Sequence, residues 1–477
     1  MNRQIRRLSV VFGVMGFLLM LNLSLQQVLL ADSTKARDGN ARVLFAEYDR
    51  QRGPILVQNT QVAQSDPTDD SLKYLRVYSD GPLYAPATGF YSIVYGATGI
   101  EKTNNSVLNG TGPAFIVDRL GQLFGGRQVQ GGAVTLTLDP AAQQAAADAL
   151  GNAVGSVTAL DPKTGAVLAL VQSPSFDPNK LSSHDPLSIT EYYKALEADP
   201  RQPLLNRPLV STQPPGSSFK LVTAAAALAA GYEPNSVLPG PTLYTVPGTS
   251  DTIPNFWKGP CGPDDSVTMS EALAISCNTA FSYLGNQLGD DALRAQADKF
   301  GFNTAFTIPL SAADSRYPDN LNPTQTAQSA IGQFNVAATT LQMAMVGASI
   351  ANGGVTMVPY VVQDTRGSNL QIISSTKPQQ HAVAMTPENS QKLLTMMAGV
   401  VDHGTGTMAK IPGVQVGGKT GTAETGDGRP DVSWFVGVAP LDDPKVVVAV
   451  AIENSPDAAS GPLAMTTARN VMEAVLQ

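Results

Sequence analysis

The hydrophobic pattern is clearest after residue 132, where short apolar runs alternate with longer segments of helical period. Short runs bounded by turn residues are typical of buried strands, whereas apolar positions recurring every three or four residues indicate helices with one buried face. Strands are predicted at residues 134–138, 156–160, 166–171, 432–438 and 446–452. Helices are predicted at residues 140–150, 220–230, 269–288, 291–300, 339–352, 387–401 and 464–475. Strands at both ends with helices between them predict a mixed α+β domain, in which one sheet carries an inserted helical region.

Residues 1–31 have the pattern of a membrane segment. Three arginines precede an apolar run over residues 8–30, which as a helix would span roughly 30 Å, enough to cross a bilayer. Arginines before the run place the N-terminus in the cytoplasm and the rest of the chain outside. A cleaved signal peptide is the alternative, but Leu29 stands where such a peptide needs a small residue. We therefore expect a single-pass anchor.

Residues 32–131 are polar, glycine-rich and irregular, and we interpret them as a small module that precedes a domain at 132–477. An extracytoplasmic location permits disulfides, and Cys261 and Cys277 are the only cysteines in the chain. They either form one bridge that closes a short loop or remain two buried thiols.

Charge and histidine content exclude several classes of function. The net charge of −8 and the pI of about 5.0 argue against a nucleic-acid partner. The histidines, His184, His381 and His403, have no second ligand at metal spacing. We therefore expect no metal, no cofactor and no Ser-His-Asp triad, so a serine nucleophile would need a base other than imidazole.

A lysine three residues after a serine can serve as that base, because such residues share one face of a helix. Ser-x-x-Lys occurs at Ser217 and Lys220, and again at Ser374 and Lys377. Pro378 opposes a helix after the second pair, whereas Ser217 follows a Pro-Pro-Gly turn and opens an apolar helix. A helix N-terminus favours a developing anion, so Ser217 is the candidate nucleophile, with a simple helix cap as the alternative.

Two further patterns supply polar groups. Ser-x-Asn occurs at Ser276 and Asn278, where a hydroxyl could relay a proton and an amide could hold a peptide group; a polar cap is the alternative. Lys-Thr-Gly occurs at residues 163–165, in a tight turn between strands, and at residues 419–421, in a glycine-rich segment. Glycines would let a ligand's backbone approach a strand edge, so Lys419 is the candidate.

The ordered set Ser217 with Lys220, Ser276 with Asn278, and Lys419 resembles the motifs of class B penicillin-binding proteins. Further similar segments lie at residues 52–53, 91–101, 213–220, 331–333, 351–354, 402–407 and 434–440. The short N-terminal module is most similar to the actinobacterial penicillin-binding protein A type. This resemblance implies a transpeptidase fold with a central antiparallel sheet, preceded by a docking or dimerisation module.

The resemblance also implies a reaction, peptidoglycan D,D-transpeptidation during growth or division. Ser217 would attack the penultimate D-alanine of a stem peptide, and an amine of a neighbouring stem would accept the acyl group. Lys220 would take the proton of Ser217, and Lys419 would lower the pKa of Lys220 by its charge. Ser276 would relay a proton to the leaving amine, and Asn278 would align the donor peptide.

Substrate contacts are implied on the Lys-Thr-Gly strand. Thr420, Gly421 and Thr422 would form the substrate edge, the two threonines holding a terminal carboxylate with the lysine before them. Backbone N–H groups of Ser217 and Thr422 would form an oxyanion hole. Trp434 either lines the cleft or packs in the core.

The implied partners are peptidoglycan stem peptides, β-lactams that acylate the same serine, and the membrane. A membrane glycan polymerase and proteins of division or elongation are further expected partners. Two alternatives use the same site: a D,D-carboxypeptidase, with water as acceptor, and a non-catalytic sensor of muropeptides or β-lactams. A class A β-lactamase is disfavoured, because the chain is long and has no Glu-x-x-Leu-Asn segment.

Overall fold

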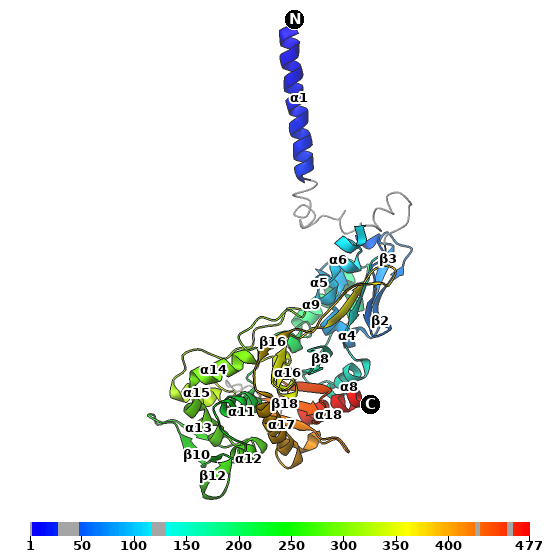
Figure 1. Ribbon diagram of the computed structural model, residues 1–477. Helices are drawn as coiled ribbons and strands as arrows, with labels where there is room; N and C mark the ends of the chain where they lie inside the picture. The colour runs from blue at the N-terminus through cyan, green and yellow to red at the C-terminus, as the bar shows by residue number, and fades with distance from the viewer. Residues whose placement is uncertain (1, 27–46, 117–129, 425–429, 456–460) are drawn as a thin grey trace.

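The computed structural model describes residues 2–26, 47–116, 130–424, 430–455 and 461–477. Helix α1 (Asn2–Ser24) projects from one end of an elongated molecule, as Figure 1 shows. Its stretch Arg3–Ser24 is long and apolar enough to cross a membrane, and its side chains are exposed. The last residues of the predicted apolar run, 27–30, lie outside the described residues.

The domain is built on a five-stranded antiparallel sheet with strand order β17-β18-β19-β7-β8. Strands β7 (Gly155–Leu160) and β8 (Val167–Ser173) come from the beginning of the domain. Strands β17 (Gly417–Ala423), β18 (Val432–Ala439) and β19 (Val446–Ile452) come from its end. Both ends of the segment therefore meet in one sheet, which confirms the predicted α+β arrangement.

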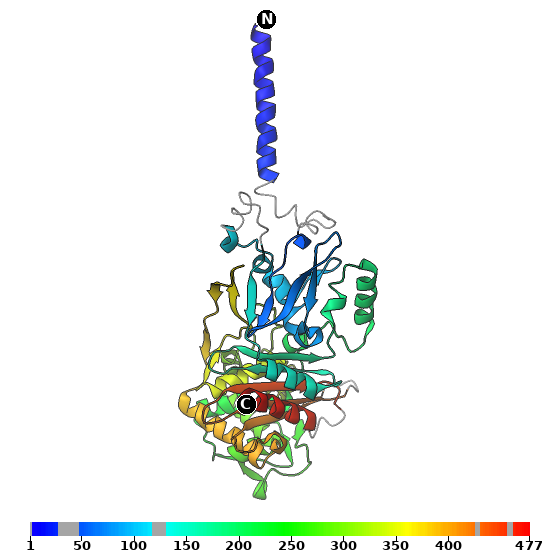
Figure 2. The same ribbon diagram turned by 90° about the vertical axis from the view of Figure 1, so that its right-hand side faces the viewer.

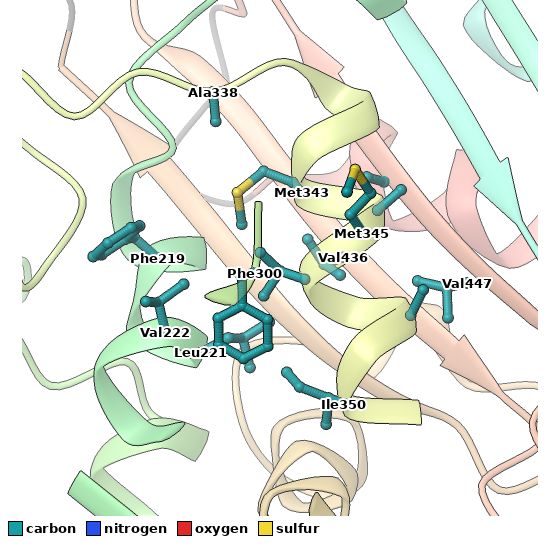
Figure 3. Packing of buried hydrophobic residues seen from close by; sticks show 14 of the residues in the cluster. Phe219, Leu221, Val222, Phe300, Ala338, Met343, Met345, Ile350, Val436 and Val447 are labelled. Atoms are coloured by element: carbon teal, nitrogen blue, oxygen red, sulfur yellow. The ribbon is translucent and has the colours of Figure 1, made fainter. Parts of the chain in front are cut away.

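Helices cover both faces of this sheet, which explains why its central strands are apolar at nearly every position. One face carries α8 (Pro140–Leu150) and α18 (Pro462–Leu476), and the other carries α16 (Thr340–Ala351). Figure 3 shows the core on the α16 side of the sheet, where side chains of α16 and of the sheet meet those of α11 (Lys220–Ala229). The helix that follows Ser217 is thus anchored in the largest hydrophobic core.

Most of the predicted helices are confirmed, with ends that differ by no more than two residues. They are α8, α11, α14 (Asp290–Lys299), α16, α17 (Pro387–Asp402) and α18. Asp139 caps α8 by accepting a hydrogen bond from the Ala142 N–H at 2.9 Å, and Pro140 occupies the first turn. Local capping signals therefore set these boundaries.

The single helix predicted at residues 269–288 is wrong. The structure has two helices there, α12 (Met269–Ala274) and α13 (Asn278–Leu288). Ser276 between them has a φ of 64°, in the left-handed region, which a continuous helix does not contain. Cys277 then begins a new helix by accepting a hydrogen bond from the Ala280 N–H through its sulfur. The break falls within the Ser-x-Asn motif.

A second sheet, of six strands, joins the N-terminal part of the chain to the domain (Figure 2). In spatial order its strands are β15 (Ile372–Ser375), β14 (Val362–Arg366), β6 (Ala133–Leu136), β1 (Ile55–Val57), β2 (Thr60–Pro67) and β3 (Tyr74–Tyr78). Strand β6 pairs in parallel with β1 and antiparallel with β14. The sheet therefore crosses the boundary expected between residues 131 and 132.

A buried ionic cluster holds the N-terminal module together. The Glu101 carboxylate accepts hydrogen bonds from Arg52 Nε at 2.5 Å, Arg76 Nε at 2.7 Å and the Tyr78 hydroxyl at 3.1 Å. Burial alone would raise the pKa of Glu101, but the two guanidinium groups outweigh burial and lower it. This carboxylate therefore stays ionised and compensates buried positive charge.

Candidate active site

Ser217 lies in the short 3₁₀ turn η4 (Gly216–Phe219), which leads directly into α11. Gly216 has a φ of 51°, and a Cβ atom there would lie 2.2 Å from the carbonyl oxygen of Thr422. A Cβ atom at Gly421 would come within 2.8 Å of the backbone just before the turn. The two glycines thus allow the Ser217 turn to lie against strand β17.

Two buried lysines meet at one hydroxyl group beside this turn. The Nζ atoms of Lys220 and Lys419 lie 3.2 Å and 2.9 Å from Ser276 Oγ. Lys220 also donates to the Ser276 carbonyl oxygen and to Asn278 Oδ1, each at 2.7 Å. Lys419 donates to the Thr420 carbonyl oxygen at 2.9 Å. The structure therefore brings the Ser-x-x-Lys helix, the Ser-x-Asn motif and the Lys-Thr-Gly strand together.

Burial sets the charge of both lysines. Desolvation, together with the positive charge of Lys419, lowers the pKa of Lys220 well below the usual 10.5. Desolvation lowers the pKa of Lys419 to about 7. A neutral amine has two N–H groups, and two oxygen acceptors 2.7 Å from Lys220 match them. The lone pair of Lys220 is then left to accept a proton.

The three residues after Lys419 run along the edge strand β17. Thr420 and Thr422 are partly exposed, and Gly421 between them is buried, as expected for an extended segment. The Thr420 hydroxyl lies 2.6 Å from the Thr405 hydroxyl, which belongs to the loop after α17. Two partly exposed threonine side chains therefore lie on one face of this strand.

Trp434 is a core residue rather than part of an open cleft. It lies on β18, opposite Gly421, and is only 1% exposed. Its indole N–H donates to the Pro214 carbonyl oxygen at 2.9 Å. Of the two roles that the sequence left open, the structure favours packing, and the indole fixes the backbone that leads into the Ser217 turn.

The second copies of the two repeated motifs lie elsewhere. Ser374 is on the exposed strand β15, far along the chain from α11 and in the other sheet. Lys163 is in the turn between β7 and β8, where its exposed ammonium group pairs with Asp443 at 2.5 Å. Neither copy joins the lysine cluster, in agreement with the choice made from sequence context.

Cys261 and Cys277 are joined by a disulfide. Of the two possibilities left open by the sequence, a bridge or two buried thiols, the structure has the bridge. Cys277 is the central residue of the Ser-x-Asn motif, between Ser276 and Asn278. The bond therefore ties the loop before Cys261 to the segment that contacts both lysines.

Comparison with known proteins agrees with this geometry. The penicillin binding protein transpeptidase domain matches residues 155–473, and the penicillin binding protein A dimerisation domain matches residues 52–134. The chain belongs to the penicillin-binding protein transpeptidase family. The peptidoglycan D,D-transpeptidase PbpA of Mycolicibacterium smegmatis is 42% identical over 100% of this chain and 99% of its own length. PbpA of Mycobacterium tuberculosis is also 42% identical, over the same shares.

Solved structures of this transpeptidase family have the same fold. The ceftriaxone acyl-enzyme of penicillin-binding protein A from M. tuberculosis superposes with a TM-score of 0.88 and 41% identity, covering 91% of this chain and 100% of that one. The penicillin G acyl-enzyme gives 0.86 and 41%, covering 90% and 100%. The predicted fold and the resemblance to the penicillin-binding protein A type are both confirmed.

Sequence reasoning missed one residue of this transpeptidase site, Asn255. It is 1% exposed, and its Oδ1 accepts hydrogen bonds from the backbone N–H groups of Asn278 at 2.9 Å and Thr279 at 3.1 Å. Its Nδ2 donates to the carbonyl oxygens of Pro241 at 3.0 Å and Gly259 at 2.9 Å. Asn255 thus caps α13 from outside, and a lone asparagine in a loop gives no sequence signal for that role.

Proposed function

We propose that this chain is a serine D,D-transpeptidase that cross-links peptidoglycan stem peptides through an acyl-enzyme on Ser217. The observation that carries this proposal is the convergence of Lys220 and Lys419 on the Ser276 hydroxyl, beside the Ser217 turn. The function of relatives that match the whole chain, named peptidoglycan D,D-transpeptidases, supports the same reaction.

Acylation begins with proton transfer from Ser217 to neutral Lys220. The Ser217 oxygen forms a bond to the carbonyl carbon of the penultimate D-alanine, and the bond from that carbon to the nitrogen of the terminal D-alanine breaks. The leaving nitrogen receives a proton from Lys220 through the Ser276 hydroxyl, which lies within hydrogen-bond distance of both lysines. Terminal D-alanine leaves, and an ester on Ser217 remains.

The oxyanion of the tetrahedral intermediate is stabilised by the backbone N–H groups of Ser217 and Thr422. The close approach of Gly216 to Thr422 supports this pairing, because it sets the turn against β17. A donor of this kind typically contributes roughly 3–4 kcal/mol to the transition state.

Ground-state contacts come from the same strand and from Asn278. Lys419, Thr420 and Thr422 hold the terminal carboxylate of the donor. The Asn278 amide accepts from Lys220 at 2.7 Å and donates to the Pro254 carbonyl oxygen at 3.2 Å, which leaves a second N–H for the donor peptide. β-Lactams acylate Ser217 as mimics of this donor.

The same proposal includes a location. Helix α1 anchors the chain, and the three arginines at its N-terminal end keep that end in the cytoplasm and the catalytic domain outside. A membrane glycan polymerase and division or elongation proteins are the partners expected at this surface.

The test is mass spectrometry of the full chain in detergent after exposure to penicillin, with the modified residue mapped by peptide analysis. One penicilloyl adduct on Ser217 is expected, with no adduct in S217A and normal labelling in the matched variant S374A. An adduct on Ser374, or no adduct in the wild type, contradicts the proposal; the second outcome favours a non-catalytic sensor.

The identity of the acceptor, an amine or water, distinguishes a transpeptidase from a D,D-carboxypeptidase. A synthetic stem peptide ending in D-alanyl-D-alanine, incubated with an amine, is expected to give the amide product together with free D-alanine. Hydrolysed peptide alone, at every amine concentration, would identify a D,D-carboxypeptidase instead.

A further inference from the structure

A pocket of about 340 Å³ opens beside the candidate active site. Its lining consists of Trp257, Pro260, Ile275, His403, Gly404 and Thr405. None of these residues has a role in the acylation step described above, and the pocket is of a size that accepts part of a small ligand.

The pocket is connected to the site at two points. Thr405 lines it and shares a hydrogen bond of 2.6 Å with Thr420, the residue after Lys419. Ile275 lines it and directly precedes Ser276, whose hydroxyl contacts both catalytic lysines. The pocket therefore lies next to the Lys419 and Thr420 end of the site, where the proposed function places the residue that leaves.

The aromatic wall of the pocket is fixed in place. Trp257 is 41% exposed, and its indole N–H donates to the Pro260 carbonyl oxygen at 3.1 Å. Asn255, two residues earlier, is buried and fully engaged, and Cys261, four residues later, is bonded to Cys277. The loop therefore presents the indole in one orientation, and a ligand pays little ordering entropy to bind against it.

The lining has an apolar wall and a polar rim. Trp257, Pro260 and Ile275 supply the wall. At the rim the His403 ring lies 3.1 Å from the Glu271 carboxylate, and both side chains are exposed to solvent. A wall and a rim of this kind suit an aliphatic chain that continues into a polar group.

We propose that this pocket binds the aliphatic chain of the amine acceptor in the second half of the reaction. The proposal rests on the proposed function, because it needs an acyl-enzyme on Ser217. In that step the acceptor nitrogen forms a bond to the acyl carbon, the ester bond to Ser217 Oγ breaks, and the proton lost by the amine ends on Ser217. The step mirrors acylation, so the acceptor nitrogen takes the position of the departed nitrogen, and the chain behind it extends past Thr420.

The test uses acceptors that differ only in chain length. The full-length protein in detergent is given a stem peptide ending in D-alanyl-D-alanine, with D-alanine, D-norvaline or D-norleucine as the acceptor. These share the amine and the carboxylate, and each methylene that becomes buried should favour transfer by up to about fourfold. We expect the wild type to use D-norleucine roughly tenfold better than labelled D-alanine, as measured by product mass.

Trp257→Ala should reduce this preference to about twofold or less, since the indole is the largest side chain of the apolar wall. Phe256→Ala is the matched control, because Phe256 is the adjacent aromatic residue, is 71% exposed and is not part of the lining. Both variants should be acylated by penicillin at the wild-type rate, which also shows that they are folded.

Each outcome has one meaning. Absence of chain-length preference in the wild type, or equal loss in both variants, overturns the pocket proposal. Slower penicillin acylation in Trp257→Ala also overturns it, because the residue would then act in the first half-reaction. Transfer to water alone contradicts the proposed function, because it identifies a D,D-carboxypeptidase. Absence of any penicillin adduct on Ser217 in the wild type also contradicts the proposed function.

Discussion

At the scale of single residues, the site depends on one positive charge lowering the proton affinity of a neighbouring amine. Lys220 and Lys419 are fully buried and share the Ser276 hydroxyl. Burial and the charge of Lys419 both lower the pKa of Lys220, well below the usual 10.5. The proposed base is therefore neutral over a pH range in which an exposed lysine is charged.

Removing the charge of Lys419 should raise the pKa of Lys220. In K419M the acidic limb of the profile of acylation rate against pH should therefore move to higher pH. On the acidic side of the profile, K419M should react about tenfold more slowly than the wild type for each pH unit by which the limb moves. The second-order rate of penicillin labelling across the neutral range measures this effect. The matched control is K163M, in the exposed Lys-Thr-Gly turn, which should leave the profile unchanged; an unmoved limb in K419M would show that Lys419 does not tune the base.

The site residues divide into those with a local sequence signal and those without. Ser217 and Lys220 are separated by a helical turn, so spacing alone suggests that they meet, and the Pro-Pro-Gly turn distinguishes them from Ser374 and Lys377. Asn255 acts on residues more than twenty positions away, through contacts that only the folded loop creates. Periodicity and spacing therefore predict the reactive groups, but not the groups that hold them.

At the scale of elements, the break between α12 and α13 shows how tertiary contacts override a local pattern. The apolar period is continuous over residues 269–288, and it predicts one helix. Asn255 and the disulfide at Cys277 provide a cap and a fixed point from outside the segment, which stabilise the turn at Ser276. The same turn directs the Ser276 hydroxyl to the lysines.

Asn255→Ala should destabilise this break, because one buried and one partly buried N–H group at the start of α13 would lose their acceptor. We expect the free energy of unfolding to fall by about 2–4 kcal/mol, and penicillin acylation to slow as the motif loses its position. Urea unfolding and stopped-flow labelling measure the two effects. Asn286 lies in the same helix, and Asn286→Ala removes a single hydrogen bond to the Tyr244 hydroxyl of β10 (Leu243–Thr245), so it should change both far less. Equal effects of the two substitutions would contradict a special role for Asn255.

At the scale of the whole molecule, the six-stranded sheet makes the N-terminal module and the catalytic domain one structural unit. The sequence predicts a strand at residues 134–138, but pairing with β1 and β14 depends on the fold and has no local signal. The catalytic domain also contributes β15 to this sheet. A boundary drawn from composition therefore separates strands that are hydrogen-bonded neighbours.

A chain cut at residue 132 should for this reason be less soluble than one cut at residue 47. Without β1, strand β6 becomes an unprotected edge, and such edges pair with other chains. Size-exclusion chromatography of fragments 47–477 and 132–477 should show a monomer in the first case and aggregate in the second. A monomeric 132–477 fragment with normal penicillin labelling would show that the shared sheet is dispensable.

The bond between Cys261 and Cys277 also has a topological consequence. It encloses the exposed turn η5 (Pro263–Asp265), and exposed turns are the sites that peptidases prefer to cut. One such cut would open the backbone but leave both fragments covalently attached. The strand that carries Lys419 and the turn that carries Ser217 would then remain parts of a single molecule until the disulfide was reduced.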